Sequence, residues 1–188
     1  MEDVDGATKV VVQTRVGIFV LVLGEDEPEK VLDDEDRHGR PAECFALGRH
    51  RDESIVVVAR QAIRRVDSAR SVVSSLTVHS ASGGSRVLVE DHAGEITGMA
   101  IGRWDGHEVV VTGDGDGFIR VLCLERGREL AHIRAHGEAV TSVAFARNAE
   151  TTLLVTSGED NRVGVWDPRG PGGLVGETDF PDSLGAVA

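Results

Sequence analysis

Residues 135–167, AHGEAVTSVAFARNAETTLLVTSGEDNRVGVWD, contain the pattern that decides the expected fold. Here and just beyond, runs of aliphatic and β-branched residues alternate with short polar segments rich in Gly, Asp and Asn. Runs of this length with such boundaries are typical of β-strands, and no helical periodicity lies between them. The pattern predicts a unit of four short strands at 140–146, 152–156, 162–166 and 174–178, with a hairpin turn at 158–161.

The same pattern recurs 44 residues upstream without a gap. The shift places His92 on His136, Thr112 on Thr156 and Asp116 on Asp160, while Leu122 falls on Trp166. A further shift of 44 residues begins another copy, in which Phe180 takes the place of His136. A period in the forties is typical of propeller blades or solenoid repeats.

Weaker copies precede these two. Residues 38–49 resemble 92–103 at a spacing of 54, and the extra length predicts a long Ser-rich loop at 68–85 after a tight hairpin turn near Arg60 and Gln61. Residues 9–20 resemble 55–66, so the strand at 7–13 is expected to be the second strand of another unit.

The repeat at 135–167 resembles the WD-repeat family, most clearly in the Trp166-Asp167 pair at its end. The resemblance implies an all-β fold, a WD-type β-propeller region that spans the chain in about four four-stranded blades. The expected blades are approximately 7–37, 38–91, 92–135 and 136–179, with a further inner strand at 183–188.

The resemblance also implies a structural tetrad of hydrogen bonds, carried onto His136, Thr156, Asp160 and Trp166. A closed chain of such bonds would satisfy polar groups that a blade must bury. The upstream copy keeps three members of the tetrad, His92, Thr112 and Asp116. It should fold with fewer of these hydrogen bonds, because Leu122 replaces the Trp.

The two chain ends are in complementary phase, since the first unit begins with a second strand and the last copy stops in an inner strand. They could complete one shared blade, which would close a four-bladed ring. A fragment of a longer propeller, or self-association of two chains through the end strands into an eight-bladed ring, remain the alternatives.

Composition excludes several function classes. A formal charge of −12 argues against nucleic-acid binding, although residues 25–36 are acidic and 37–86 carry nine Arg and only four acids. No apolar run is long enough to span a bilayer, and no secretory signal begins the chain, so we expect no membrane contact. Two isolated cysteines, Cys44 and Cys123, fit a reducing cytoplasm. The scarcity of Lys beside many Arg resembles a high-GC bacterial composition.

Motifs for catalysis or cofactors are absent from the sequence. The segment TGDGDGF, residues 112–118, invites a calcium site, but a hairpin turn explains it better, since strand residues follow where further ligands would be needed. His38, His92 and His136 recur at repeat spacing, and the other histidines lack the spacing of a zinc motif. We therefore expect no metal, no cofactor and no enzymatic activity.

The resemblance implies a scaffold that binds a protein or peptide on the face made by the outer-to-inner connections and the tetrad turns. Mostly acidic residues fall there, which favours a basic partner, although solvated loops that keep the protein soluble explain them equally well. The second hypothesis is a sensor or regulatory propeller segment of a larger signalling enzyme, such as a bacterial kinase or NTPase. The candidate partner-binding residues are Glu90, Asp91, Glu95, Asp114, Arg134, Glu138, Glu159 and Asn161.

Overall fold

A computed structural model describes residues 3–4, 7–14, 17–22, 29–32, 44–66, 69–80, 84–147, 152–167 and 173–180. Side-chain burial is described from residue 44 onward, apart from 62–71 and 93 within these ranges. The described residues form strands and the turns between them, arranged in four four-stranded antiparallel sheets. The all-β prediction is therefore confirmed.

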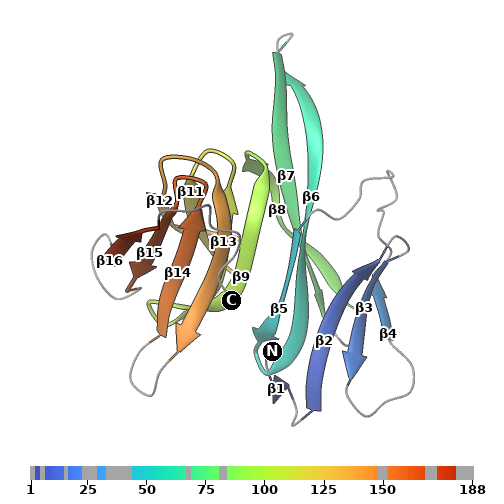
Figure 1. Cartoon of the computed structure of the whole chain (residues 1–188). Helices are drawn as coiled ribbons and strands as arrows, with labels where there is room; N and C mark the ends of the chain where they lie inside the picture. The colour runs from blue at the N-terminus through green and yellow to red at the C-terminus, as the bar shows by residue number, and fades with distance from the viewer. Residues whose placement is uncertain are drawn as a thin grey trace.

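Each sheet takes its four strands from one continuous segment of the chain, and neighbouring strands in the sequence pair with each other. In Figure 1 the sheets follow one another as a row, from the first on the right to the last on the left. The first sheet contains β1 (Asp3–Val4), β2 (Ala7–Thr14), β3 (Gly17–Val22) and β4 (Glu29–Leu32), and the second contains β5 (Cys44–His50), β6 (Glu53–Val66), β7 (Ala69–Ser80) and β8 (Ser85–Ala93).

The third and fourth sheets follow the two clear repeats. The third consists of β9 (Ile96–Trp104), β10 (His107–Asp114), β11 (Phe118–Cys123) and β12 (Glu129–Arg134). The fourth consists of β13 (Val140–Arg147), β14 (Thr152–Gly158), β15 (Arg162–Trp166) and β16 (Leu174–Asp179). The strands predicted for residues 140–178 lie within two residues of these bounds.

Two hydrophobic cores lie between successive sheets. One joins the second and third sheets and includes Val57, Leu76 and Val110; the other joins the third and fourth and includes Val111 and Leu154. These five side chains are fully buried. Because adjacent residues of β10 enter different cores, the third sheet is covered on both faces.

The strands β5, β9 and β13, each the first strand of its sheet, pack closely because glycine leaves room for a side chain of the next sheet. A Cβ atom on Gly48 would lie 2.5 Å from Cγ2 of Ile101, and one on Gly102 would lie 2.4 Å from the ring of Phe145. Gly48 and Gly102 occupy equivalent positions in repeats 54 residues apart, and Ile101 and Phe145 occupy equivalent positions in repeats 44 residues apart. The same contact is thus repeated from sheet to sheet.

The structure corrects the prediction for the Ser-rich stretch and for the tight turn at Arg60 and Gln61. The β6–β7 ladder runs on from Arg60↔Ser75 to Val66↔Ala69, so most of the predicted loop is strand. The hydroxyl of the fully buried Ser74 donates to the carbonyl of Gly94, which removes the cost of burying it. Beyond its pairing with β5 and β8, this hairpin continues as a two-stranded ribbon that protrudes from the sheet (Figure 1).

Some expectations fall outside the described residues. These include the inner strand expected at 183–188, the repeat histidine at position 38 and most of the acidic run at 25–36. The first sheet begins with the short strand β1, one strand earlier than the sequence pattern predicts.

Candidate functional site

The four residues of the expected tetrad lie together in the fourth sheet. The indole N–H of Trp166 donates to Oγ1 of Thr156 over 3.0 Å, and Thr156 Oγ1 lies 2.9 Å from Nε2 of His136. His136 Nδ1 lies 2.9 Å from Oδ1 of Asp160. An ionised Asp160 can only accept, so Nδ1 of His136 carries the proton between them; Nε2 of the neutral imidazole then accepts the Thr156 hydroxyl, whose oxygen accepts the indole N–H. This chain of donors links β14, β15 and the connection that precedes β13.

Asp160 closes the chain in a charged state. Burial disfavours its ionised form, but the backbone N–H of Gly137, the ring of His136 and the backbone N–H of Arg162 outweigh this and lower the pKa of Asp160. Nearby Gly158 has no room for a side chain, since a Cβ atom there would lie 2.5 Å from Nδ1 of His136. The glycine therefore leaves the space in which His136 meets Asp160.

Asp160→Asn is expected to reduce the acid sensitivity of the protein. The folded-state pKa of Asp160 is below its ordinary value of 3.8, so its stabilisation is present above that value and is lost as pH falls through the folded-state pKa. Urea denaturation between about pH 5 and pH 2 should show a shallower loss of stability in the variant. The exposed Glu159→Gln serves as the control, and parallel pH profiles for wild type and Asp160→Asn would contradict the assignment.

The third sheet repeats part of this arrangement with a different acid. His92 Nε2 lies 2.8 Å from Oγ1 of Thr112, and both residues are buried. Asp116, the expected third member, is instead exposed, and the buried carboxyl of the turn belongs to Asp114. Asp114 accepts the backbone N–H groups of Asp116 and Phe118.

The repeat register explains this correction. Asp114 occupies the position of Gly158, the residue whose missing side chain lets His136 reach Asp160. A carboxyl at that position fills the space from within the turn, and Asp116 is left at the surface. The only indication in the sequence is that two acids, Asp114 and Asp116, lie two residues apart, so that either could take the buried position in the turn.

The turns and connections at one end of the strands of the third and fourth sheets form a continuous surface, here called the connection face. It consists of residues 94–95, 115–117, 135–139 and 159–161. Its segments are joined by backbone hydrogen bonds, from Gly115 N–H to Glu95 O, from Ala135 and His136 N–H to Gly117 O, and from Glu159 N–H to Ala139 O. The face is therefore one hydrogen-bonded surface although its segments are far apart in the sequence.

The structure brings only part of the predicted partner-binding set onto this face. Glu95, Glu138 and Glu159 are exposed on it, and the exposed Arg134 lies at its border. The guanidinium of Arg134 lies 5.1 Å from the ring centre of Phe118, a cation–π contact.

The remaining residues of that set differ from the expectation. Asp114 is 3% exposed and occupied within its turn, so it is not available to a partner. Asn161 is partly buried with a φ of 61°, and its carbonyl accepts the N–H of Phe180. Glu90 and Asp91 are exposed but lie on β8 rather than in the connecting segments. Asp116, which the sequence placed in the interior, joins the exposed acids of the face.

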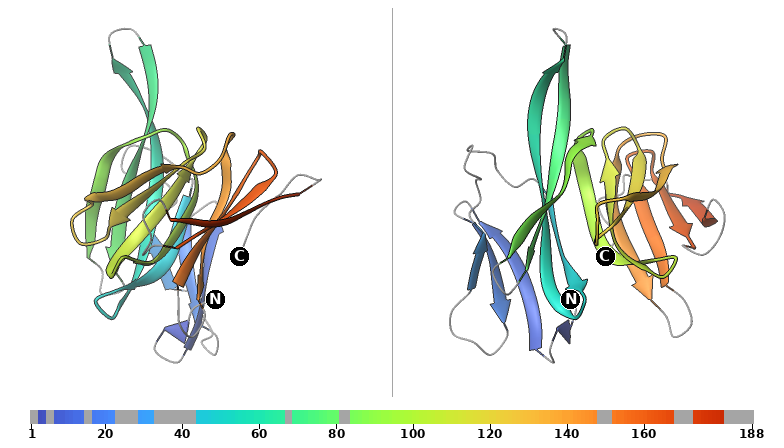
Figure 2. Two further views of the ribbon diagram at one scale, coloured as in Figure 1. Left: turned by 90° about the vertical axis from the view of Figure 1, so that its left-hand side faces the viewer. Right: turned by 180° about the vertical axis from the view of Figure 1, so that it is seen from behind.

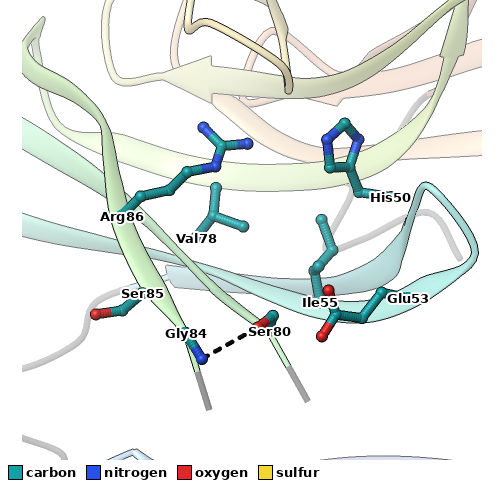
Figure 3. A pocket seen from close by; sticks show the side chains of 8 residues that line it. All are labelled: His50, Glu53, Ile55, Val78, Ser80, Gly84, Ser85 and Arg86. Carbon is teal, nitrogen blue, oxygen red and sulfur yellow. Dashed lines mark hydrogen bonds between the residues drawn. The ribbon is translucent and has the colours of Figure 1, made fainter. Parts of the chain in front are cut away.

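A small hollow of about 250 Å³ lies near the opposite end of the strands, and the sequence did not predict it. Figure 3 shows His50 and Arg86 facing it, with Val78 between them. His50 Nδ1 lies 2.7 Å from Oε2 of Glu108, and the Arg86 guanidinium donates to the carbonyl of Leu124. Both side chains therefore join the second sheet to the third. The lining residues are His50, Glu53, Ile55, Val78, Ser80, Gly84, Ser85 and Arg86.

Other chemistry-bearing side chains are dispersed over the described part of the chain. Within it, no three His, Cys, Asp or Glu side chains are grouped closely enough to hold a metal ion. His79 lies apart from the tetrad, and burial, followed by the positive charge of Arg60, lowers its pKa. In the same residues no helix has the length and apolar character needed to cross a bilayer.

Comparison with known proteins finds a family match for part of the chain. Residues 127–167 match the family model described as "WD domain, G-beta repeat". The chain is also similar to autophagy-related protein 16 of Arabidopsis thaliana, with 40% identity over 60 residues. That match covers 32% of this chain and 11% of the curated relative, so the chain spans only a small part of that protein.

A solved structure supports the fold independently. The computationally designed Ika4 protein superposes with a TM-score of 0.57 over 81% of each chain, at 24% identity. The matched repeat contains the complete hydrogen-bonded set of His136, Thr156, Asp160 and Trp166. The chain therefore contains a repeat of the WD type at residues 127–167.

Proposed function

We propose that this chain is a non-catalytic scaffold that binds a protein or peptide on the connection face. The observation that carries the proposal is the run of backbone hydrogen bonds that joins the segments of this face. A surface fixed in this way loses little conformational freedom on binding, which favours affinity. His136 and Thr156, which could otherwise serve in catalysis, are occupied by each other in the interior.

The charge of the face supports a basic partner. Four exposed acids lie on it, Glu95, Asp116, Glu138 and Glu159, and the whole chain has a formal charge of −12. A cluster of one sign attracts and orients a partner of the opposite sign. The partner class that fits is therefore a protein segment or peptide rich in Lys and Arg.

Peptides that bind the face should lose affinity when its charge is removed. We expect peptides selected from a random display library on the immobilised chain to be enriched in Lys and Arg. Fluorescence anisotropy should show that such a peptide binds the variant Glu95→Gln/Glu138→Gln/Glu159→Gln with a dissociation constant at least about tenfold higher than wild type. The reason is that these acids attract and orient the peptide.

The matched control removes three exposed acids at the other end of the strands, Asp52→Asn, Asp105→Asn and Glu125→Gln. Because the two triple variants change net charge equally, any general charge effect would be the same in both. Equal loss of binding in the two variants would contradict the connection face as the site. Turnover of hydrolase, phosphatase or lyase substrates that one point substitution abolishes would contradict the non-catalytic assignment.

The proposal extends to the assembly and setting of the scaffold. We take the four sheets as blades of a propeller that is completed by further sheets, and we place the protein in the cytoplasm, where the thiols of Cys44 and Cys123 stay reduced. As a regulatory segment of a larger signalling enzyme, the second function suggested by the sequence, the chain would use the same face.

A further inference from the structure

The fourth sheet has an apolar face that its counterpart in the third sheet buries completely. Val109, Val111, Ile119 and Val121 of the third sheet are all 0% exposed, because the fourth sheet covers them. Shifted by one repeat of 44 residues, these positions become Leu153, Val155, Val163 and Val165, and all four are partly exposed. On the outer strand β16, Leu174 is 50% exposed, whereas its counterpart Leu130 packs against the core.

Strand β13, the first strand of its sheet, carries the same receiving features as the strands before it. Ala146 occupies the position of Gly102, which accommodates Phe145 of the next sheet, and Ala146 is exposed. Thr97 donates its hydroxyl to the Val140 carbonyl of the next sheet, whereas its counterpart Thr141 bonds to the Ser157 hydroxyl of its own sheet. The fourth sheet thus retains the receiving half of an interface that the structure already uses between its sheets.

The first sheet is suited to supply the other half. Its strands β2 and β3 contain the consecutive apolar runs 10–12 and 18–22, a pattern typical of strands covered on both faces. The first and fourth sheets lie at opposite ends of the row in front and rear views (Figures 1 and 2). The partly exposed apolar face described above lies at the fourth-sheet end of the described row.

We propose that the open face of the fourth sheet binds the first sheet of a second copy of this chain. The occupant follows from continuity, since each earlier interface in the row is formed by a sheet of the same four-stranded kind. Two copies related by a twofold axis would make the contact twice and leave no free end, so association stops at two. The inference rests on the proposed scaffold, and it adds that the scaffold is a ring of two chains.

Sedimentation velocity of the full chain tests the proposal. Wild type should sediment at twice the 20.0 kDa of one chain. Val163→Glu and Leu174→Glu should each raise the dissociation constant of the dimer by about a hundredfold or more, because the new charge would be buried without a partner. Leu174 is half exposed in the single chain, so its variant keeps the test valid if Val163→Glu impairs folding.

The matched control is Val87→Glu on β8, since Val87 is 55% exposed on the second sheet and lies away from this face. A wild type that is still monomeric at a concentration of about 10⁻⁴ M overturns the proposal. A dimer that persists in both Val163→Glu and Leu174→Glu also overturns it. Open-ended oligomers also overturn it, because a closed pair cannot grow. Peptide binding measured on the same variants separates the two ideas: retained binding in a monomer would overturn the ring alone.

Discussion

Trp166→Ala is expected to destabilise the protein more than any other truncation in the two clear repeats. The substitution removes a side chain that is 4% exposed, at a cost of about 3–5 kcal/mol for the cavity. It also takes away the donor to Thr156, whose hydroxyl keeps its hydrogen bond to His136, and the lost hydrogen bond costs about 0.5–1.5 kcal/mol more. Urea denaturation monitored by circular dichroism should show the shift in midpoint.

Leu122→Ala provides the comparison, because Leu122 occupies the same repeat position in the third sheet and is 3% exposed. Its truncation should cost about 2–5 kcal/mol, with no hydrogen bond lost. Trp166→Phe keeps most of the buried ring and removes the N–H, so it should isolate the contribution of the hydrogen bond to Thr156. Equal midpoint shifts for the two Ala variants would contradict a stabilising role for the tetrad.

Gly117→Ala is expected to have the second-largest effect, since it strains the backbone where the third and fourth sheets meet. Gly117 has a φ of +85°, a conformation that costs a residue with a side chain about 1–2 kcal/mol. An added Cβ atom would also lie 2.4 Å from the carbonyl oxygen of His136 and 2.5 Å from that of Glu138. Backbone atoms cannot move aside as a flexible side chain can, so we expect a total loss above about 3 kcal/mol.

Gly115→Ala is the control in the same turn, because nothing lies within 4 Å of a Cβ atom there and its φ is not positive. Thermal melts of the two variants should differ by at least about 6 °C, since a loss above about 3 kcal/mol lowers the melting temperature by about 2–4 °C per kcal/mol. Similar melting temperatures would show that the connection between Gly117 and the segment 135–139 gives way more easily than the structure implies.

The sequence predicted the fourth sheet most fully because pattern and side-chain chemistry agree there. Strands, turn and tetrad partners all follow from the register of one repeat, and the structure places His136, Thr156, Asp160 and Trp166 within hydrogen-bond distance of one another. The third sheet shows where register alone was insufficient. The register aligned Asp116 with Asp160 and so predicted that Asp116 would be the buried acid. Asp114, which aligns with Gly158, has a carboxyl where the fourth sheet has no side chain, and it is buried instead of Asp116.

The β6–β7 hairpin shows the opposite difficulty. Its serines suggested a loop, since hydroxyl side chains compete for backbone hydrogen bonds and favour turns. In the structure, the alternating apolar residues determine the conformation, and Ser74 and Ser75 direct their hydroxyls to backbone carbonyls instead. The hollow beside His50 and Arg86 could not be predicted, because its residues come from four strands of a weakly repetitive sheet.

The row of sheets has a consequence for how the molecule opens. Each sheet is built from a continuous segment, and the second, third and fourth sheets pack on one another through shared cores, so stability is shared between adjacent units as in a linear array. The third sheet, covered on both faces, can separate only after one of its neighbours has left. In the dissociated single chain, unfolding should therefore begin at the fourth sheet, where one face is in contact with water, and move inward through cooperative steps rather than occur in a single event.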